Sequence, residues 1–396
     1  MEKPAIYGGI PIREKKLYYG RQYIDEADIE AVTTVLRSDW LTCGPQIAAL
    51  EDKLCHMTGA KYAISCANGT AALHIACLAA GVEIGDEVIT SPLTFAASAN
   101  CALYCGATPI FADIDMGTLA IDPEAVRAAI TTKTKAVIAV DYAGQSAAMD
   151  ELVSICQQHG LILISDAAHS IGTKYKGKAV GSIADMTTFS FHPVKSVTCG
   201  EGGAVLTNDE DYYRRLRLFR EHGITRKAEL FEKPSTESWY YEQIVLGYNY
   251  RLTDIQAVLL SSQLDKLEMF SNRRKEIITR YREAFRAISG ITMQEEIAES
   301  ETTSHLFVIR IDSEALRIGR DEFIRAMAVE NIICNLHYIP VYHHPYYQNL
   351  GYQYGLCPNV ERVFTELVTL PLHYGMSDED TEDVIHAVEK IVRYHS

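Results

Sequence analysis

Residues 161–169 read Leu-Ile-Leu-Ile-Ser-Asp-Ala-Ala-His, an unbroken apolar run that ends in a carboxylate. A run without polar alternation is typical of a strand covered on both faces, as in a parallel sheet between layers of helices. A carboxylate at the carboxyl end of such a strand lies where open α/β sheets bind ligands. It is costly to bury unless a cation or hydrogen-bond donors meet it. Asp166 is therefore a candidate ligand-binding residue, and His169 could contact the same ligand.

Short apolar runs alternate with helical patterns over residues 57–207. The predicted strands are 61–65, 87–90, 109–112, 135–140, 161–165 and 204–207, and the predicted helices are 70–80, 95–104 and 149–159. This alternation predicts the α/β class, with a mostly parallel sheet that helices flank.

The residue composition of the chain changes after residue 208. Residues 209–240 are rich in charge and are interpreted as a solvated helix face. A long helical pattern covers 252–288, strand candidates lie at 305–311 and 332–338, and a last helix is predicted over 378–394. We expect a large domain with an N-terminal arm (1–252), a linking helix (253–289) and a smaller C-terminal α/β domain (290–396).

Composition excludes several classes of protein. The 396 residues include 37 basic and 52 acidic side chains, a net charge of −15, which repels nucleic acids and anionic membranes. The ten cysteines form no CxxC pair, which favours free thiols in a cytosolic protein over disulfides or a metal site. No apolar run approaches the ~18 residues of a membrane span, and the N-terminus does not resemble a secretory signal. We expect a cytoplasmic enzyme without a metal.

Two further stretches could carry chemistry. Ser-Cys-Ala-Asn-Gly-Thr at 65–70 lies between a predicted strand and a helix, where Gly69 and Thr70 could bind a phosphate through free N–H groups. The same residues also suit an ordinary turn with a helix cap. Lys195 follows a predicted strand among apolar and small residues, which would bury its amine, lower its pKa and make it a nucleophile.

The three candidate groups together match pyridoxal phosphate. Its phosphate needs an anion site, its ring nitrogen a carboxylate, and its aldehyde a lysine that forms an imine. The start of the helix after residue 68, Asp166 and Lys195 could meet these needs. Phe95 could cover the face of the ring, although it could equally be a core phenylalanine.

The sequence resembles the DegT-type sugar-nucleotide aminotransferases of the fold-type-I pyridoxal-phosphate class over nearly its whole length. The matching blocks are 69–74, 85–90, 166–169, 190–195, 200–203 and 247–254. The resemblance implies a large domain with a mostly parallel mixed sheet and a smaller C-terminal domain. Because Lys195 is present, the chain is unlike the branch of dehydratases that carries a histidine there.

The resemblance also implies roles for individual residues. Lys195 would be the imine lysine and catalytic base, and Asp166 would contact the pyridine nitrogen. The other implied cofactor contacts are Phe95 on the ring, His169 near the phenolic oxygen, Gly69, Thr70 and Ser190 around the phosphate, and Asn249 from the neighbouring subunit. A homodimer with shared active sites is part of this expectation.

Further segments resemble family members that aminate C4 of a UDP-linked 4-keto-6-deoxy-N-acetylhexosamine with L-glutamate. They are 18–22, 39–45, 239–242, 337–341 and 345–347, together with Ile12. Thr42, Arg226 and His337 are weaker candidates for the sugar pocket. A UDP-4-keto-pentose or a dTDP-keto-hexose is an alternative substrate, and a pyridoxal-phosphate-binding regulator without turnover is an alternative of another class.

Overall fold

A seven-stranded sheet forms the centre of the computed structural model, which describes residues 2–395. The strand order is β2-β10-β9-β6-β5-β3-β4, and β10 alone runs antiparallel to its neighbours. The strands are β2 (Tyr62–Cys66), β3 (Glu87–Thr90), β4 (Thr108–Phe111), β5 (Thr134–Val140), β6 (Ile162–Asp166), β9 (Met186–Ser190) and β10 (Gly203–Thr207). The predicted α/β class with a mostly parallel mixed sheet is confirmed.

Helices cover both faces of this sheet, which explains the unbroken apolar strands. Neighbouring residues of β5 and β6 point to opposite faces and are buried on each. Ile138 and Ile164 belong to one apolar cluster with the helix α3, whereas Val137 and Leu163 belong to another with the helix α6. The helices around the sheet are α2 (Pro45–Thr58), α3 (Gly69–Ala79), α4 (Ala97–Tyr104), α5 (Pro123–Ala129), α6 (Met149–His159) and α7 (Glu210–Arg220).

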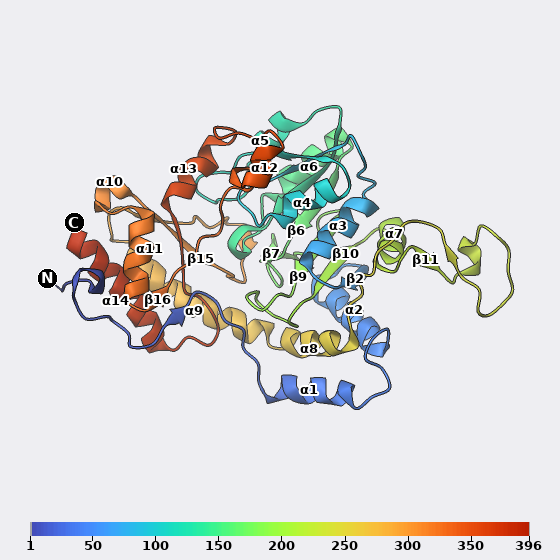
Figure 1. The fold of residues 1–396 in the computed structure, drawn as a ribbon, viewed down its shortest axis with the longest axis horizontal. Coiled ribbons are helices and arrows are strands. Elements are labelled where there is room, and N and C mark those ends of the chain that lie inside the picture. The colour runs from blue at the N-terminus through green and yellow to red at the C-terminus, as the bar shows by residue number, and fades with distance from the viewer. Residues whose placement is uncertain (1, 396) are drawn as a thin grey trace.

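A smaller sheet, β13-β15-β17, builds the C-terminal part with its own apolar cluster. Its strands are β13 (Ile291–Met293), β15 (Phe307–Ile311) and β17 (Leu367–Leu370), and its helices are α10 (Ser313–Leu316), α11 (Arg320–Val329), α12 (Pro345–Asn349), α13 (Pro358–Glu366) and α14 (Asp378–His395). The helices α8 (Asp254–Leu264) and α9 (Leu267–Phe285) run from the large sheet to this part (Figure 1).

The expected continuous helix over 252–288 is interrupted between α8 and α9. Lys266 lies at the break and forms ion pairs with Asp25 (2.5 Å) and Asp28 (2.8 Å) of the N-terminal segment. The expected strand 332–338 is also shorter: Ile332–Ile333 (β16) pairs with Leu17–Tyr18 (β1), and Asn335 forms an isolated bridge with Thr369. Tertiary contacts at both places override the local pattern.

The N-terminal segment is fastened to the C-terminal part. Glu330 is fully buried, and its carboxylate accepts hydrogen bonds from the backbone N–H groups of Ala5 (2.8 Å) and Ile12 (2.9 Å). Lys390 Nζ donates to the same carboxylate at 3.1 Å and to Ile10 O at 2.7 Å. The helix α1 (Glu26–Leu36) then packs along α8. The division predicted from the sequence includes this arm in the large domain, whereas Ala5, Ile10 and Ile12 contact Glu330 and Lys390 of the C-terminal part.

Residues 221–250 form an arm that projects from the body at the end opposite the two termini (Figure 1). The arm contains β11 (Ile224–Thr225), a short 3-10 helix (Ala228–Leu230) and β12 (Glu242–Gln243). Trp239, Tyr241 and Leu246 are exposed on it. Of the charged stretch 209–240, only the first part is the helix α7.

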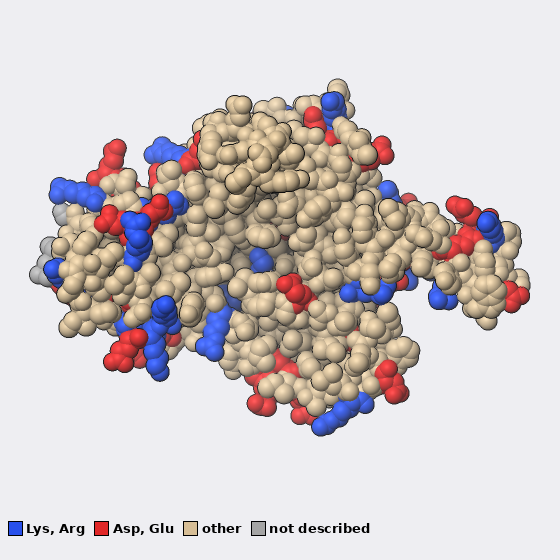
Figure 2. All heavy atoms as spheres, viewed as in Figure 1, with Lys and Arg blue, Asp and Glu red and all other residues tan. Residues whose placement is uncertain are grey.

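Charged side chains are distributed unevenly over the face shown in Figure 2. Acidic and basic groups mingle around the termini and the lower helices, whereas the region over α4 and α12 is almost free of charge and a hollow lies near the centre. Among residues 2–395, no helix has the length and apolar composition that crossing a bilayer requires.

Candidate functional site

A cavity of about 640 Å³ opens at the carboxyl edge of the large sheet. It lies between this edge and the segment Asn335–Tyr338 of the C-terminal part. The predicted site residues that line it are Gly69, Thr70, Phe95, Asp166, His169, Ser190, Lys195 and His337. The sheet register explains the convergence, because Val140 pairs with Asp166 and Asp166 with Thr188, so these strand ends are level.

The start of α3 forms one wall of the cavity and is free to bind an anion. Asn68 caps the helix, since its Oδ1 accepts a hydrogen bond from Ala71 N (2.8 Å). The first N–H groups of a helix have no partner within it and carry the positive end of the helix dipole. A Cβ on Gly69 would lie 2.7 Å from Ser190 Cβ. Glycine thus lets Ser190 lie beside the free N–H groups, a cradle of the right chemistry for a phosphate.

Asp166 presents a buried carboxylate with few partners. Its Oδ2 accepts a hydrogen bond from Ser98 Oγ (2.6 Å) and its Oδ1 accepts one from Ala168 N (3.2 Å). Burial raises the pKa of Asp166, and the two hydrogen bonds and the charge of Lys195 oppose this effect. A cation or a charged N–H donor in the cavity would stabilise the ionised form.

Lys195 lies in the turn after β9 and reaches the same cavity. Burial lowers the pKa of its amine to about 8, while the negative charge of Asp166 opposes this shift. Its Nζ forms no hydrogen bond or ion pair with any of residues 2–395. A neutral amine without a partner is a competent nucleophile and base.

His169 is neutral and only half satisfied. Its Nε2 lies 3.0 Å from the hydroxyl of Tyr338, whereas its buried Nδ1 has no partner among the described residues. Burial, together with the charge of Lys195, lowers its pKa well below the ordinary value. The unsatisfied nitrogen leaves one polar group available to a ligand.

Phe95 and His337 complete the walls. Phe95 is 62% exposed, so it is not the core phenylalanine that the sequence allowed, and its ring can cover a planar ligand. The Nδ1 of His337 lies 2.9 Å from Thr369 Oγ1, and burial lowers the pKa of this imidazole to about 4. His337 is therefore neutral in the cavity.

Three predicted residues do not line this cavity. Thr42 is exposed in the connection between α1 and α2, where it forms a bridge with Thr253. Arg226 is exposed on the arm with its guanidinium 5.1 Å from the ring of Tyr241, and Asn249 is exposed at the base of the arm. A single chain does not bring these residues to the site.

Sequence reasoning missed Asp141, Tyr338 and Tyr19. Asp141 is buried beside Asp166, accepts hydrogen bonds from Ser170 Oγ (2.6 Å) and Ala147 N (3.0 Å), and has its pKa raised to about 7, chiefly by burial. Its signal was the same as that of Asp166, a carboxylate directly after a buried strand. Tyr338 and Tyr19 line the cavity from the segments 337–341 and 18–22, which resemble family members but did not assign a role to either tyrosine.

The residues present fit pyridoxal phosphate. An anion cradle, a buried carboxylate, a partnerless amine and an exposed aromatic ring face one cavity, and these are the groups that the cofactor requires. A second cavity of about 620 Å³ adjoins the first and shares Thr94, Phe95, Leu336 and Tyr338 with it. Among residues 2–395, no cluster of three or more His, Cys, Asp or Glu side chains is arranged to hold a metal ion.

Comparison with known proteins agrees with this geometry. Residues 22–389 match the model of the DegT/DnrJ/EryC1/StrS aminotransferase family. The spore coat polysaccharide biosynthesis protein SpsC of Bacillus subtilis is 42% identical over 383 residues, which cover 96% of this chain and 98% of SpsC. Helicobacter pylori PseC, an aminotransferase of pseudaminic acid biosynthesis, superposes with a TM-score of 0.89 at 31% identity and covers 96% of this chain and 100% of its own.

A third relative carries the cofactor. The sugar aminotransferase Spr1654 of Streptococcus pneumoniae, solved in its PLP form, superposes with a TM-score of 0.89 at 31% identity, and the match covers 96% of this chain and 100% of that one. Its PMP form gives a TM-score of 0.90 at 32% identity with the same coverage.

Proposed function

Since the chain belongs to the DegT/DnrJ/EryC1/StrS family of sugar aminotransferases, which use pyridoxal phosphate, we propose that it aminates a nucleotide-linked keto-sugar at C4. The acceptor is UDP-2-acetamido-2,6-dideoxy-β-L-arabino-hex-4-ulose and the donor is L-glutamate. The product is UDP-4-amino-4,6-dideoxy-N-acetyl-β-L-altrosamine. The likeness to PseC, an aminotransferase of pseudaminic acid biosynthesis, supports this choice of sugar.

The observation that carries the proposal is the convergence of Lys195, Asp166 and the start of α3 on one cavity. Pyridoxal phosphate, when bound, supplies an aldehyde that accepts the amino group and a ring that draws off negative charge from the reacting carbon. The N–H groups of Gly69 and Thr70 and the Ser190 hydroxyl would hold the phosphate. Asp166 would accept a hydrogen bond from the ring nitrogen and keep it protonated.

Lys195 would perform the proton transfers. At pH 8 about half of its amines are neutral, because burial lowers its pKa to about 8. The neutral Nζ can take the α-proton of glutamate in the first half-reaction, and in the second half-reaction its ammonium form can deliver a proton to C4 of the sugar. Phe95 would cover the ring and His169 would contact its oxygen.

The second cavity supports an extended substrate. Its walls carry the aromatic rings of Phe95, Tyr104, Tyr338, Tyr346 and Tyr347, and Asn100 and His344 add polar groups. Aromatic faces suit a flat base, and the polar groups can bond its edge. A substrate that fills both cavities would place its sugar near Lys195 in the first cavity and its nucleotide in the second.

A homodimer would complete the site. Asn249 and Arg226 lie on or beside the projecting arm rather than at the cavity, and the arm exposes Trp239 and Leu246. We propose that the arm contacts a second copy, so that Asn249 reaches the partner's phosphate site. The large domain (1–252), linking segment (253–289) and small domain (290–396) remain our proposed division.

The test is incubation of the holoenzyme with L-glutamate and a panel of UDP- and dTDP-keto-sugars, with mass spectrometry of the products. We expect the UDP-linked 4-keto-6-deoxy-N-acetylhexosamine to be aminated faster than the other sugars of the panel. Preferred turnover of a keto-pentose or a dTDP-sugar would overturn the substrate, and absence of pyridoxamine phosphate after glutamate addition would overturn the aminotransferase itself.

A further inference from the structure

The base of the projecting arm, Tyr248-Asn249-Tyr250, packs against the helix α3, which begins at the phosphate cradle. The ring of His74 on α3 lies 4.8 Å from the ring of Tyr248 and 6.0 Å from that of Tyr250, centroid to centroid. The Nδ1 of His74 lies 3.2 Å from the Tyr250 hydroxyl. Because His74 is only 4% exposed, one buried imidazole joins α3 to both tyrosines.

The two tyrosines and Asn249 point to opposite sides of this segment. The segment is extended, since Asn249 forms an antiparallel bridge with Glu221. Successive side chains of an extended chain point to opposite sides. The rings of Tyr248 and Tyr250 accordingly stack at 5.1 Å and 11°, and both are half-buried, whereas Asn249 is exposed. The contacts of the tyrosines with His74 therefore leave the Asn249 amide facing away from its own chain.

Backbone hydrogen bonds hold the same segment. Tyr250 N donates to Arg220 O at the end of α7 (3.0 Å), and Tyr250 O accepts from Ala67 N (2.7 Å), directly before the cap of α3. These bonds fix the path of the backbone, and the contacts at His74 hold the two rings on its inner side. The base of the arm is thus tied to the turn and the helix that form the cradle.

We infer that His74 is a positioning residue, which holds the base of the arm so that Asn249 can bind the cofactor phosphate in the site of the other subunit. The inference rests on the homodimer with shared sites proposed above. The Asn249 side chain forms no hydrogen bond with any of residues 2–395, so its amide is free to donate to a phosphate oxygen. His74 does not line the cavity of its own chain, so its effect on the cofactor would pass through the arm.

The test is a mixed dimer in which one chain carries Lys195→Ala and the other keeps its lysine. Only the chain with Lys195 can attach pyridoxal phosphate covalently, so the absorbance of the attached cofactor gives the dissociation constant of that one site. In the proposed dimer, this site receives Asn249 from the chain that carries Lys195→Ala. Asn249→Ala on that chain should raise the dissociation constant about tenfold, because a hydrogen bond to a charged group is lost.

His74→Leu on the Lys195→Ala chain should raise the dissociation constant by a similar factor, about tenfold, because the arm then presents Asn249 poorly. The matched control is His74→Leu on the chain that keeps Lys195. It should leave the dissociation constant unchanged, because the intact arm of the other chain serves the site. An equal or larger rise in this control would overturn the inference, since His74 would then act through the cradle of its own chain.

Tyr250→Phe is a milder variant that removes only the hydroxyl facing His74. On the Lys195→Ala chain it should raise the dissociation constant about threefold. If His74→Leu prevents the dimer from forming, an unchanged constant in Tyr250→Phe overturns the inference.

Failure of the inference can be distinguished from failure of the proposed function. Asn249→Ala without effect on the site of the other chain would overturn the shared site itself. An effect of Asn249→Ala, with none from His74→Leu or Tyr250→Phe on the same chain, would overturn the role of His74 alone.

Discussion

Two sets of a carboxylate and a lysine in this molecule differ in how completely their polar groups are satisfied. The side chains of Glu330 and Lys390 are fully buried, and the N-terminal segment supplies their other partners: the backbone groups of Ala5, Ile10 and Ile12, and the Glu2 carboxylate, 3.5 Å from Lys390 Nζ. Asp166 is buried and Lys195 is half-buried, yet Asp166 has two donors and the Lys195 Nζ has no hydrogen-bonding partner among the described residues. Glu330 and Lys390, whose polar groups all have partners, fasten two distant segments. Asp166 and Lys195, whose polar groups do not, can still bind a ligand.

Removing the unpartnered amine should have the largest effect on activity. Lys195→Ala should lower the rate of amino transfer by about 10³-fold or more, because proton transfer and cofactor attachment both need Nζ. The free energy of unfolding of the apoprotein should not fall, since a half-buried amine without an ion-pair partner is removed. Product formation by mass spectrometry and thermal unfolding measure the two effects.

Lys176→Ala is the control for this experiment, because Lys176 is an exposed lysine outside the cavity that forms an ion pair with Asp150 (2.6 Å). It should keep full activity. Retained amino transfer in Lys195→Ala would remove this lysine from the mechanism.

Breaking the Glu330–Lys390 pair should have the opposite result: stability should fall and activity should not. Lys390→Met leaves the Glu330 carboxylate buried without its cation, which should cost about 3–5 kcal/mol of unfolding free energy. Activity per folded molecule should stay unchanged. Urea unfolding measures the loss, with Lys176→Met as the control at less than about 1 kcal/mol. A loss below that of the control would show that Glu330 does not depend on Lys390.

Asp166→Asn tests whether the buried carboxylate of the site is needed for amino transfer. The amide keeps the shape and the Ser98 contact but cannot stabilise a protonated ring nitrogen. We expect the rate of amino transfer to fall about 10²-fold, with the cofactor still bound through the cradle at Gly69. Absorbance of the bound cofactor and the rate of its conversion by glutamate separate binding from chemistry. An unchanged rate would exclude the carboxylate from catalysis.

The pH dependence of Lys195 follows from its lowered pKa. The rate at which the apoprotein takes up pyridoxal phosphate should rise about tenfold per pH unit below pH 8 and level off above it. Because the charge of Asp166 opposes the shift, Asp166→Asn should move the midpoint to lower pH. Stopped-flow absorbance measures both curves.

The same pKa predicts how stability changes with pH. The folded apoprotein binds the Lys195 proton less tightly than the unfolded chain, so its stability relative to Lys195→Met should rise between about pH 8 and pH 10.5. A difference that stays constant over this range would show that the amine is not perturbed by burial.

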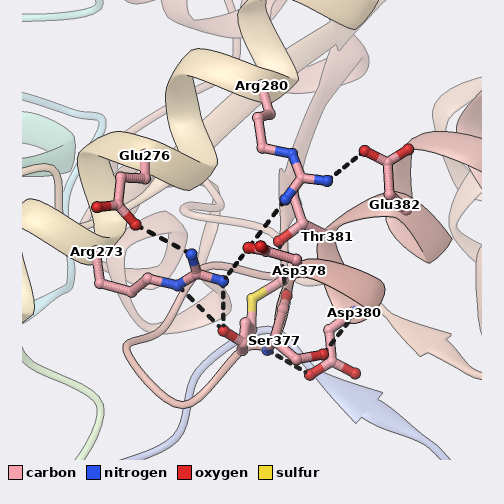
Figure 3. A network of polar contacts seen from close by, with 9 residues as sticks. Arg273, Glu276, Arg280, Ser377, Asp378, Asp380, Thr381 and Glu382 are labelled. Atoms are coloured by element: carbon pink, nitrogen blue, oxygen red, sulfur yellow. Dashed lines mark hydrogen bonds and ion pairs between the residues drawn. The ribbon is translucent and has the colours of Figure 1, made fainter.

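The smallest effect on the free energy of unfolding is expected for an ion pair that is exposed to solvent. Figure 3 shows Arg273 and Arg280 of α9 sharing Asp378 at the start of α14, at 2.9 and 3.0 Å. Asp378 is exposed, and water screens its interactions. Asp378→Asn should cost less than about 1 kcal/mol, and the cost should shrink further in high salt. A larger loss of unfolding free energy in urea would contradict this expectation. It would mean that the exposed Asp378 network stabilises the fold as much as the buried Glu330–Lys390 pair does.

Much of the site could be predicted because parallel strands end at a common edge. Asp166 and Lys195 each follow a strand with a clear apolar pattern, and Gly69 begins the helix after another. Asp141 carries the same signal and was overlooked. Tyr338 and Tyr19 come from a distant loop and the N-terminal segment, so only packing brings them to the cavity.

The sequence by itself determined the α/β class, the cofactor and the family, because these depend on local period and on residue types at strand ends. The tertiary structure decided which charges are satisfied. Whether a buried carboxylate has partners depends on groups far away along the chain, as when Ala5 and Lys390, which lie 325 and 60 residues from Glu330, meet at its carboxylate.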